Sequence, residues 1–163
     1  MQFSDKFHNI HWKNLITAVA IPLAAGGLSA WITMDGMKAF ETVNQPPLTP
    51  PMWLFPVVWS ILYALMGYAS YLVLTAPAAR DDIRRALFAY GAQLLVNLLW
   101  PVVFFNLRAC VPAFVVLVLL WALIGLTAAR FRPLSRRASL LLLPYWLWVT
   151  FAGHLNLSIC LLN

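Results

Sequence analysis

Uncharged, strongly apolar runs alternate with short polar segments along the whole chain. The apolar runs cover approximately residues 15–34, 53–75, 87–107, 111–129 and 138–162. Four of them are long enough to cross about 30 Å of hydrocarbon as helices, and the fifth is nearly so. Helices satisfy their own backbone hydrogen bonds in a bilayer, and the ten-residue alternating strands of a membrane barrel are absent. The pattern predicts an all-α integral membrane protein, a single domain over residues 1–163 built as a bundle of five transmembrane helices.

Composition supports lipid as the solvent of this chain. It is 63% hydrophobic and only 10% charged, whereas soluble domains average roughly 45–50% apolar and about 25% charged residues. The formal net charge of +6 does not indicate a nucleic-acid partner, because the basic residues fall between the apolar runs. We interpret them as loop anchors at the membrane surface.

The distribution of basic residues predicts an orientation. Only Lys38 and Arg108 lie on one side, and nine lie on the other: Lys6, Lys13, Arg80, Arg84, Arg85, Arg130, Arg132, Arg136 and Arg137. Because basic residues accumulate in cytoplasmic loops, we expect a cytoplasmic N-terminus in a bacterial-type membrane. The long loop 35–52 and the C-terminus then face the periplasm or exterior. Residues 25–27 could mimic a signal-peptide cleavage site, but we interpret the first apolar run as a retained helix.

Few residues in the predicted spans carry acid–base or metal chemistry. No charged residue falls inside a span, which disfavours an ion-coupled transporter or a proton pump. No catalytic or metal-binding residue is proposed. His154 is the one ionisable side chain in a span, and we favour a neutral imidazole hydrogen-bonded to another helix over an axial haem ligand or proton relay. Cys110 and Cys160 lie in apolar surroundings without C-x-x-C spacing, so we expect free buried thiols and no disulfide.

A proline-rich segment precedes the second span. Four prolines within residues 46–51 predict a stiff, extended loop that could lie across the mouth of the bundle as a lid. The following helix places Trp59, Tyr63, Gly67 and Ser70 on one face. This face could line a pocket or pack against another helix, and periodicity alone favours packing.

Two further spans carry polar groups beside aromatic ones. In the last span Trp148, Ala152 and Asn156 share a face. In the third, Asn97 precedes Trp100, and an amide in mid-membrane is costly without a partner or ligand. Taken together, the three faces predict a pocket for a flat apolar ligand.

Three motifs resemble the TspO/MBR family of tryptophan-rich sensory proteins, translocator proteins and peripheral benzodiazepine receptor-like proteins. They are Pro46-Pro47-x-Thr49-Pro50-Pro51 with Phe55-Pro56-x-x-Trp59-x-x-Leu62-Tyr63, then Asn97-x-x-Trp100-Pro101-x-x-Phe104-Phe105, and Pro144-Tyr145-x-x-Trp148-x-x-Phe151-Ala152-x-x-Leu155-Asn156. The resemblance extends from Ala18 to Asn163. It implies a five-helix bundle, commonly a homodimer, with a pocket open toward the first loop.

The resemblance also implies ligands and the residues that bind them. Its members bind protoporphyrin IX or haem as ligands rather than as obligatory cofactors, and some bind cholesterol or benzodiazepine-like molecules. The expected partners are therefore porphyrins, other apolar small molecules, membrane lipid and a second copy of the chain. Trp59 and Trp148 match tryptophans tied to porphyrin binding and photo-oxidative breakdown. The full set of candidate ligand-binding residues is Phe40, Trp59, Tyr63, Asn97, Trp100, Tyr145, Trp148, Ala152 and Asn156.

The sequence departs from the family pattern in three respects. Phe40 aligns roughly with a tyrosine of the first loop, and Leu48 stands where a tryptophan is frequent. No basic residue follows Arg137, so the usual C-terminal cholesterol motif is missing. Because this motif is missing, we do not expect high-affinity sterol recognition.

Three functions are compatible with these residues. The leading expectation is a tetrapyrrole-binding membrane protein with a sensory or regulatory role. A porphyrin transporter ranks lower, because inverted repeats and coupling-ion residues are missing from the sequence. A light-dependent porphyrin-degrading enzyme, in which the tryptophans supply electrons, remains open, since indoles would serve binding and chemistry alike.

Overall fold

The chain folds as a bundle of five membrane-spanning helical units. The computed structural model describes residues 11–40, 46 and 49–163. Its helices are α1 (Trp12–Phe40), α2 (Leu54–Leu74), α3 (Arg80–Pro101), the π-helical turn η2 (Val102–Asn106), α4 (Cys110–Phe131), α5 (Arg136–Leu141) and α6 (Leu143–Leu162). Because η2 continues α3 and α6 continues α5, the helices make five spans. The predicted all-α, five-span fold is confirmed.

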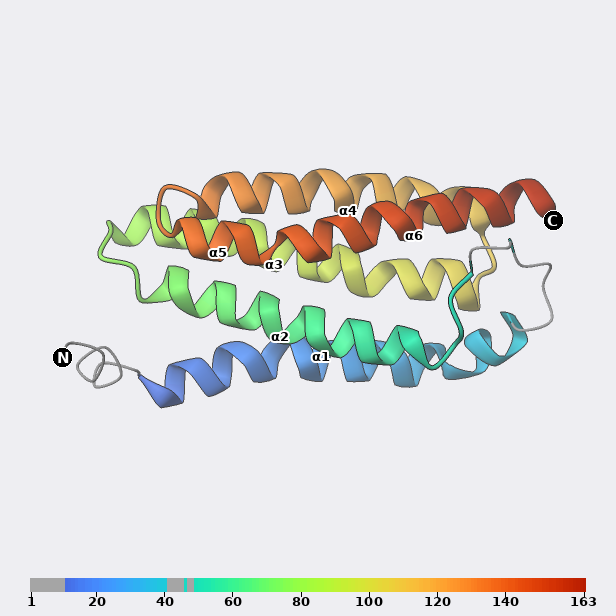
Figure 1. Ribbon diagram of the computed structural model, residues 1–163, viewed down its shortest axis with the longest axis horizontal. Helices are drawn as coiled ribbons and strands as arrows, with labels where there is room; N and C mark the ends of the chain where they lie inside the picture. The colour runs from blue at the N-terminus through green and yellow to red at the C-terminus, as the bar shows by residue number, and fades with distance from the viewer. Residues whose placement is uncertain (1–10, 41–45, 47–48) are drawn as a thin grey trace.

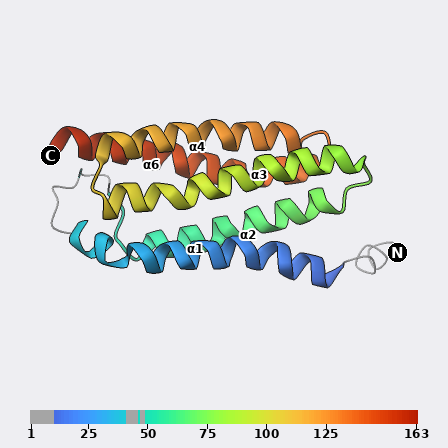
Figure 2. The same ribbon diagram turned by 180° about the vertical axis from the view of Figure 1, so that it is seen from behind.

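The helices close into a ring around a narrow core. α1 packs against α2 and η2, α2 against α5, α6 against α4, and α4 against α3. α1 and α2 lie side by side, away from α4 and α6, with α3 between the two groups (Figures 1 and 2). Gly67 of α2 lies against the α1 backbone, since a Cβ there would come within 2.5 Å of Val19 Cα. A small residue at this position lets the two helices approach closely.

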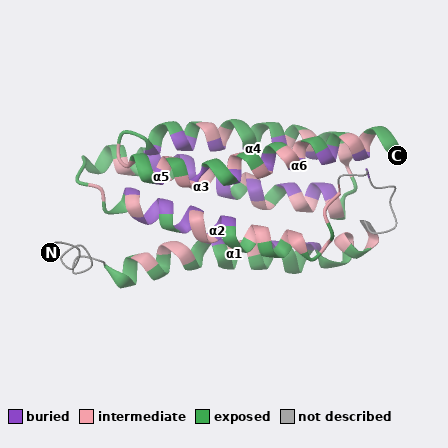
Figure 3. Cartoon of the chain, in the orientation of Figure 1, coloured by how far each residue is buried: buried purple, intermediate pink, exposed green. Residues whose placement is uncertain are grey.

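The outward faces of the helices are apolar. Trp31, Phe88 and Leu147 are each more than 70% exposed. Buried positions follow the inner faces, and exposed ones cover much of the outside (Figure 3). A water-soluble monomer rarely exposes so much contiguous apolar surface, so this surface suits hydrocarbon. The protein is an integral, multi-pass membrane protein.

Several helices extend past the apolar runs that predicted them. α1 continues six residues beyond position 34, so part of the expected 35–52 loop is helical. α3 begins at Arg80, seven residues before the third apolar run. Its first turn carries Asp81 and Asp82, which interact favourably with the N-terminal end of the helix dipole. Hydropathy marks only the part of a helix in hydrocarbon, which explains both differences.

Two prolines interrupt spans that were predicted to be continuous. Pro101 ends α3, and in the following turn the Leu107 N–H donates to the Val102 carbonyl five residues earlier, at 3.0 Å. Pro144 lies in the first turn of α6, which follows a break at Leu142. Proline has no N–H and its ring crowds the carbonyl four residues earlier, which disturbs regular α-helical bonding.

The expectation of two free thiols is wrong. Cys110 and Cys160 form a disulfide, with their Cα atoms 5.7 Å apart. Cys110 begins α4 and Cys160 lies near the end of α6, and the antiparallel packing of these helices brings the two positions together. Fifty residues separate the cysteines in sequence, and their pairing depends on tertiary structure that local spacing does not encode.

Candidate functional site

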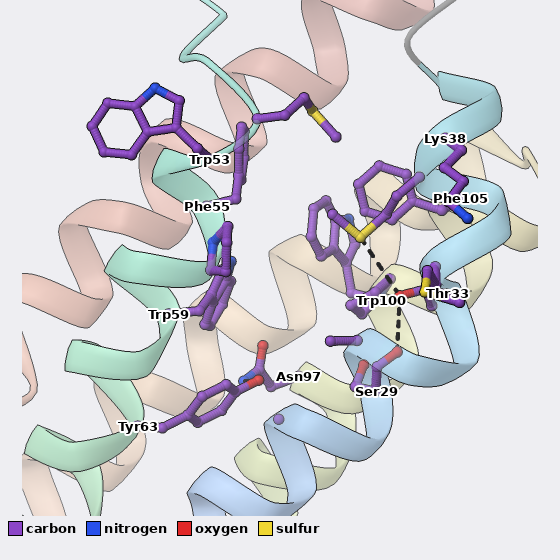
Figure 4. Close-up of a pocket in the computed structure, with 17 residues that line it drawn as sticks. Ser29, Thr33, Lys38, Trp53, Phe55, Trp59, Tyr63, Asn97, Trp100 and Phe105 are labelled. Atoms are coloured by element: carbon purple, nitrogen blue, oxygen red, sulfur yellow. Dashed lines mark hydrogen bonds between the residues drawn. The ribbon is translucent and has the colours of Figure 1, made fainter.

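A cavity of about 430 Å³ lies between α1, α2 and α3. This volume is within the roughly 300–1,000 Å³ range of small-molecule sites. Figure 4 shows side chains from α1 facing those from α2 and α3 across it. The lining residues are Gly26, Ser29, Ala30, Thr33, Met34, Met37, Lys38, Met52, Trp53, Phe55, Pro56, Trp59, Tyr63, Asn97, Trp100, Pro101 and Phe105.

Aromatic rings form most of the wall opposite α1. Trp59 packs on Tyr63 with ring centroids 5.4 Å apart. Trp100 stacks on Phe104 at 5.3 Å and meets Phe105 edge-on at 5.9 Å. Because η2 begins two residues after Trp100, the π-helical turn sets where Phe105 enters the cavity. These rings offer broad apolar faces on which a flat ligand could stack.

The inner end of the cavity is polar. The Asn97 amide Nδ2 donates to the Tyr63 hydroxyl at 3.2 Å. The buried Asn97 Oδ1 and Ser29 Oγ have no hydrogen-bond partner in the described part of the chain. Gly26 makes room here, since a Cβ at this position would collide with the Tyr63 ring. Unpaired polar atoms in an apolar wall are places where a ligand can form hydrogen bonds.

The outer end of the cavity lies near the first loop. Met52 and Trp53 line it just before α2 begins, and Lys38 lines it from the last turn of α1. Lys38 Nζ lies 3.9 Å from Asp35 Oδ1, and both side chains are largely exposed. The positions of Met52, Trp53 and Lys38 agree with the prediction that the pocket opens toward the first loop.

Asn156 supports the cavity wall without lining it. Its Oδ1 accepts from Trp100 Nε1 at 3.3 Å, and its Nδ2 donates to the Cys110 carbonyl at 3.0 Å. The Cys160 Sγ lies 3.4 Å from the same Nδ2. The indole of Trp100 is thereby held in place through Asn156 by the disulfide-linked ends of α4 and α6.

Four of the nine predicted site residues line the cavity: Trp59, Tyr63, Asn97 and Trp100. Tyr145 is fully buried beside Trp59, with centroids 6.1 Å apart, and its hydroxyl donates to Gln93 Oε1 at 2.9 Å. Ala152 is buried in the core of the bundle. The side chain of Phe40, the last residue of α1, lies outside the described residues.

Trp148 lies in a different place from Trp59. It lines a groove between α2 and the α6 unit, together with Pro50, Leu54 and Phe151. Phe55 connects the two regions, because it lines the cavity and its ring contacts Trp148 edge-on at 5.9 Å. The structure therefore separates the two predicted stacking tryptophans by one aromatic ring.

The interhelical hydrogen bond expected of His154 is not formed within the described residues. The side chain is exposed on the outer face of α6, in a shallow groove with Trp121 and Thr150. Trp121 Nε1 donates to Thr150 Oγ1 at 3.0 Å in that groove. His154 is thus remote from the lining of the cavity.

Comparison with known proteins places the chain in a family. The model of the TspO/MBR family matches residues 18–162. The chain belongs to the TspO/MBR family.

Relatives from distant organisms cover most of the chain. It is 40% identical over 124 residues to the "Tryptophan-rich protein TspO" of Chlorobaculum tepidum, covering 76% of this chain and 78% of the relative. It is 33% identical over 155 residues to the "Tryptophan-rich sensory protein" of Cereibacter sphaeroides, covering 95% and 94%. The "Translocator protein" of Ovis aries is 33% identical over 147 residues, covering 89% and 87%.

Sequence reasoning missed the α1 wall of this TspO/MBR cavity. Ser29 and Thr33 are buried there, and the Thr33 hydroxyl donates to the Ser29 carbonyl at 2.8 Å. Gly26, Ser29 and Thr33 are spaced by three and four residues, which places them on one helical face. That pattern of small and polar residues in an apolar span was the available signal.

Proposed function

We propose that this protein binds flat tetrapyrroles, protoporphyrin IX or haem, in the cavity between α1, α2 and α3, and has a sensory or regulatory role. The observation that carries the proposal is the aromatic wall of Trp59, Trp100 and Phe105 in a cavity of ligand size. Membership of the TspO/MBR family and a relative named as a tryptophan-rich sensory protein support it.

The residues of the cavity suit the porphyrin plane. Aromatic rings would cover its faces, and the apolar remainder of the lining would exclude water. An iron porphyrin would meet the thioether-bearing side chains of Met34, Met37 and Met52 in the lining. His154 lies in the separate groove on α6 and would not reach a ligand held in the cavity.

Incubation of the purified protein with protoporphyrin IX, in the dark and under light, tests the binding role. A saturable shift of the porphyrin spectrum that is stable in both conditions would support a binder. A protein-dependent new absorbing species under light would favour the porphyrin-degrading enzyme. Absence of any saturable shift would contradict tetrapyrrole binding.

A transport role is the second candidate, because relatives carry the name translocator protein. The groove that contains Trp148 lies between α2 and α6 on the outer face of the bundle. An apolar ligand could pass from lipid to the cavity past Phe55, which lines the cavity and contacts Trp148 of the groove. Uptake of porphyrin into vesicles that contain the protein would distinguish transport from binding alone.

We further propose that the N-terminus is cytoplasmic. The uneven distribution of Lys and Arg supports this orientation. The disulfide supports it as well, because the ends of α4 and α6 then face an oxidising compartment. Reporter fusions should place Asn163 outside, and cytoplasmic labelling of a cysteine introduced near Lys38 would contradict the orientation.

A further inference from the structure

One charged side chain stands out in the lining of the cavity. Lys38 is the only Asp, Glu, Lys or Arg among the described residues that line it. Its partner Asp35 is 3.9 Å away, and the two side chains are 68% and 94% exposed. Ion pairs at such exposure are weak, so the ammonium remains available to another anion. In Figure 4 the Lys38 side chain runs along α1 in the direction of Thr33.

The opposite end of the cavity has a different polarity. Asn97 Oδ1 is an acceptor without a partner, and Ser29 Oγ can donate or accept. Both residues are more than nine-tenths buried. Ser29 and Lys38 are nine residues apart on α1, which corresponds to about 14 Å along a helix. The cavity thus has a cationic mouth, an aromatic middle and a neutral polar floor.

We propose that Lys38 selects ligands that carry a carboxylate. The acid group would lie at the mouth beside the ammonium, at the membrane surface, and the flat apolar body would extend inward between the rings. The inner edge would meet Ser29 and Asn97, which discriminate by hydrogen bonding rather than by charge. This proposal rests on the proposed tetrapyrrole site and adds to it an orientation and a preference for acids over esters.

Protoporphyrin IX and its dimethyl ester test the preference, because they differ only in charge and small methyl groups. Both are titrated against the protein in lipid nanodiscs, with porphyrin fluorescence as the readout. The native protein should bind the acid about fivefold more tightly than the ester, the upper range for a solvent-accessible ion pair. Added salt should weaken binding of the acid and leave the ester unchanged.

Lys38→Gln should abolish the preference for the acid, because it weakens binding of the acid and leaves binding of the ester unchanged. Lys38→Arg should retain the preference. Arg108→Gln is the matched control, since Arg108 is exposed on the same side of the bundle and does not line this cavity. It should keep the preference. Asn97→Leu should weaken acid and ester by the same factor, because the floor contributes no charge.

The outcomes separate this inference from the proposed function. Equal affinity of the native protein for acid and ester would overturn the role of Lys38 and leave tetrapyrrole binding intact. An equal loss of affinity for acid and ester in Lys38→Gln would also overturn the role of Lys38, since that result indicates a structural effect of the substitution. Loss of the preference in Arg108→Gln would assign it to general surface charge. Failure of both porphyrins to bind the native protein would contradict the proposed function itself.

Discussion

At the scale of single residues, aromatic side chains decide what the cavity can hold. Trp59 comes from α2, Trp100 from α3 and Phe105 from η2, and all three line one cavity. Trp148, expected to share the ligand with Trp59, lies one ring away behind Phe55. We therefore expect Trp59 and Trp148 to contribute differently to ligand affinity, although the family motifs suggest the same role for both.

Substitution of individual tryptophans measures how much each ring contributes to porphyrin affinity. Trp59→Leu should weaken the binding of protoporphyrin IX by roughly 1–3 kcal/mol, by analogy with the stacking of bases on aromatic side chains. This corresponds to a rise in dissociation constant of about five- to 150-fold. Trp148→Leu should have a smaller effect, because its ring does not line the cavity. Fluorescence titration of each purified variant provides the comparison.

Trp12→Leu is the control for this series. Trp12 is 62% exposed at the start of α1 and does not line the cavity. Its substitution should leave the affinity unchanged. A larger loss in Trp148→Leu than in Trp59→Leu would show that the ligand lies in the groove between α2 and α6 instead.

At the scale of elements, the ends of helices and the short connections fix the site. η2 places Phe105, and the disulfide joins the ends of α4 and α6 behind Trp100. In the proline-rich segment, the Thr49 N–H donates to the Pro46 carbonyl at 3.0 Å. The extended conformation expected of residues 46–51 falls partly on positions 47 and 48, which lie outside the described residues, and Met52 and Trp53 lead into the start of α2.

Loss of the disulfide should destabilise the bundle. For a loop of about fifty residues, the chain-entropy model gives about 4 kcal/mol of stabilisation at 25 °C. Cys160→Ser should therefore unfold at lower SDS fraction than the native protein, with helicity followed by circular dichroism. Cys110→Ser and the double variant should behave like the single one. An unchanged midpoint after complete reduction would contradict this expectation.

The Thr49 hydroxyl provides a test of the lid hypothesis. It donates to the Pro46 carbonyl at 2.9 Å, and Thr49→Val removes this bond with little change in shape. If the segment closes the cavity, porphyrin should dissociate about two- to tenfold faster, the range for one hydrogen bond. Stopped-flow displacement measures the rate.

Thr75→Val is the matched control for the lid. The Thr75 hydroxyl donates to the Tyr71 carbonyl at 2.9 Å at the opposite end of α2, far from the mouth. This variant should dissociate porphyrin at the native rate. If a folded Thr49→Val variant releases porphyrin at the native rate, the proline-rich segment does not act as a lid.

At the scale of the whole molecule, hydropathy was enough to predict the fold. Each span exposes apolar side chains to lipid, so the five apolar runs reveal five helices. The α2 face was ambiguous because it serves two purposes: Trp59 and Tyr63 line the cavity, whereas Gly67 packs on α1. Periodicity reports that a face points inward and cannot distinguish a packed interface from a void.

Other features depended on tertiary structure. The Cys110–Cys160 pair and the Asn156–Trp100 hydrogen bond join positions about fifty residues apart. The polar wall of α1 was overlooked because Ser29 and Thr33 are mild polar residues in an apolar run. His154 was expected inside because it is polar, yet it lies on the outer face of α6.

The central claim is that the cavity between α1, α2 and α3 binds protoporphyrin IX, and filling that cavity tests it most directly. Ala30 lines the cavity from α1, whereas Ala24 is exposed on the same helix and does not. Ala30→Trp and Ala24→Trp add the same side chain to the same helix. Protoporphyrin IX is titrated against both variants and the native protein in nanodiscs, after circular dichroism has shown equal helicity. Binding should be lost in Ala30→Trp and preserved in Ala24→Trp, whereas native affinity in both variants would contradict the claim.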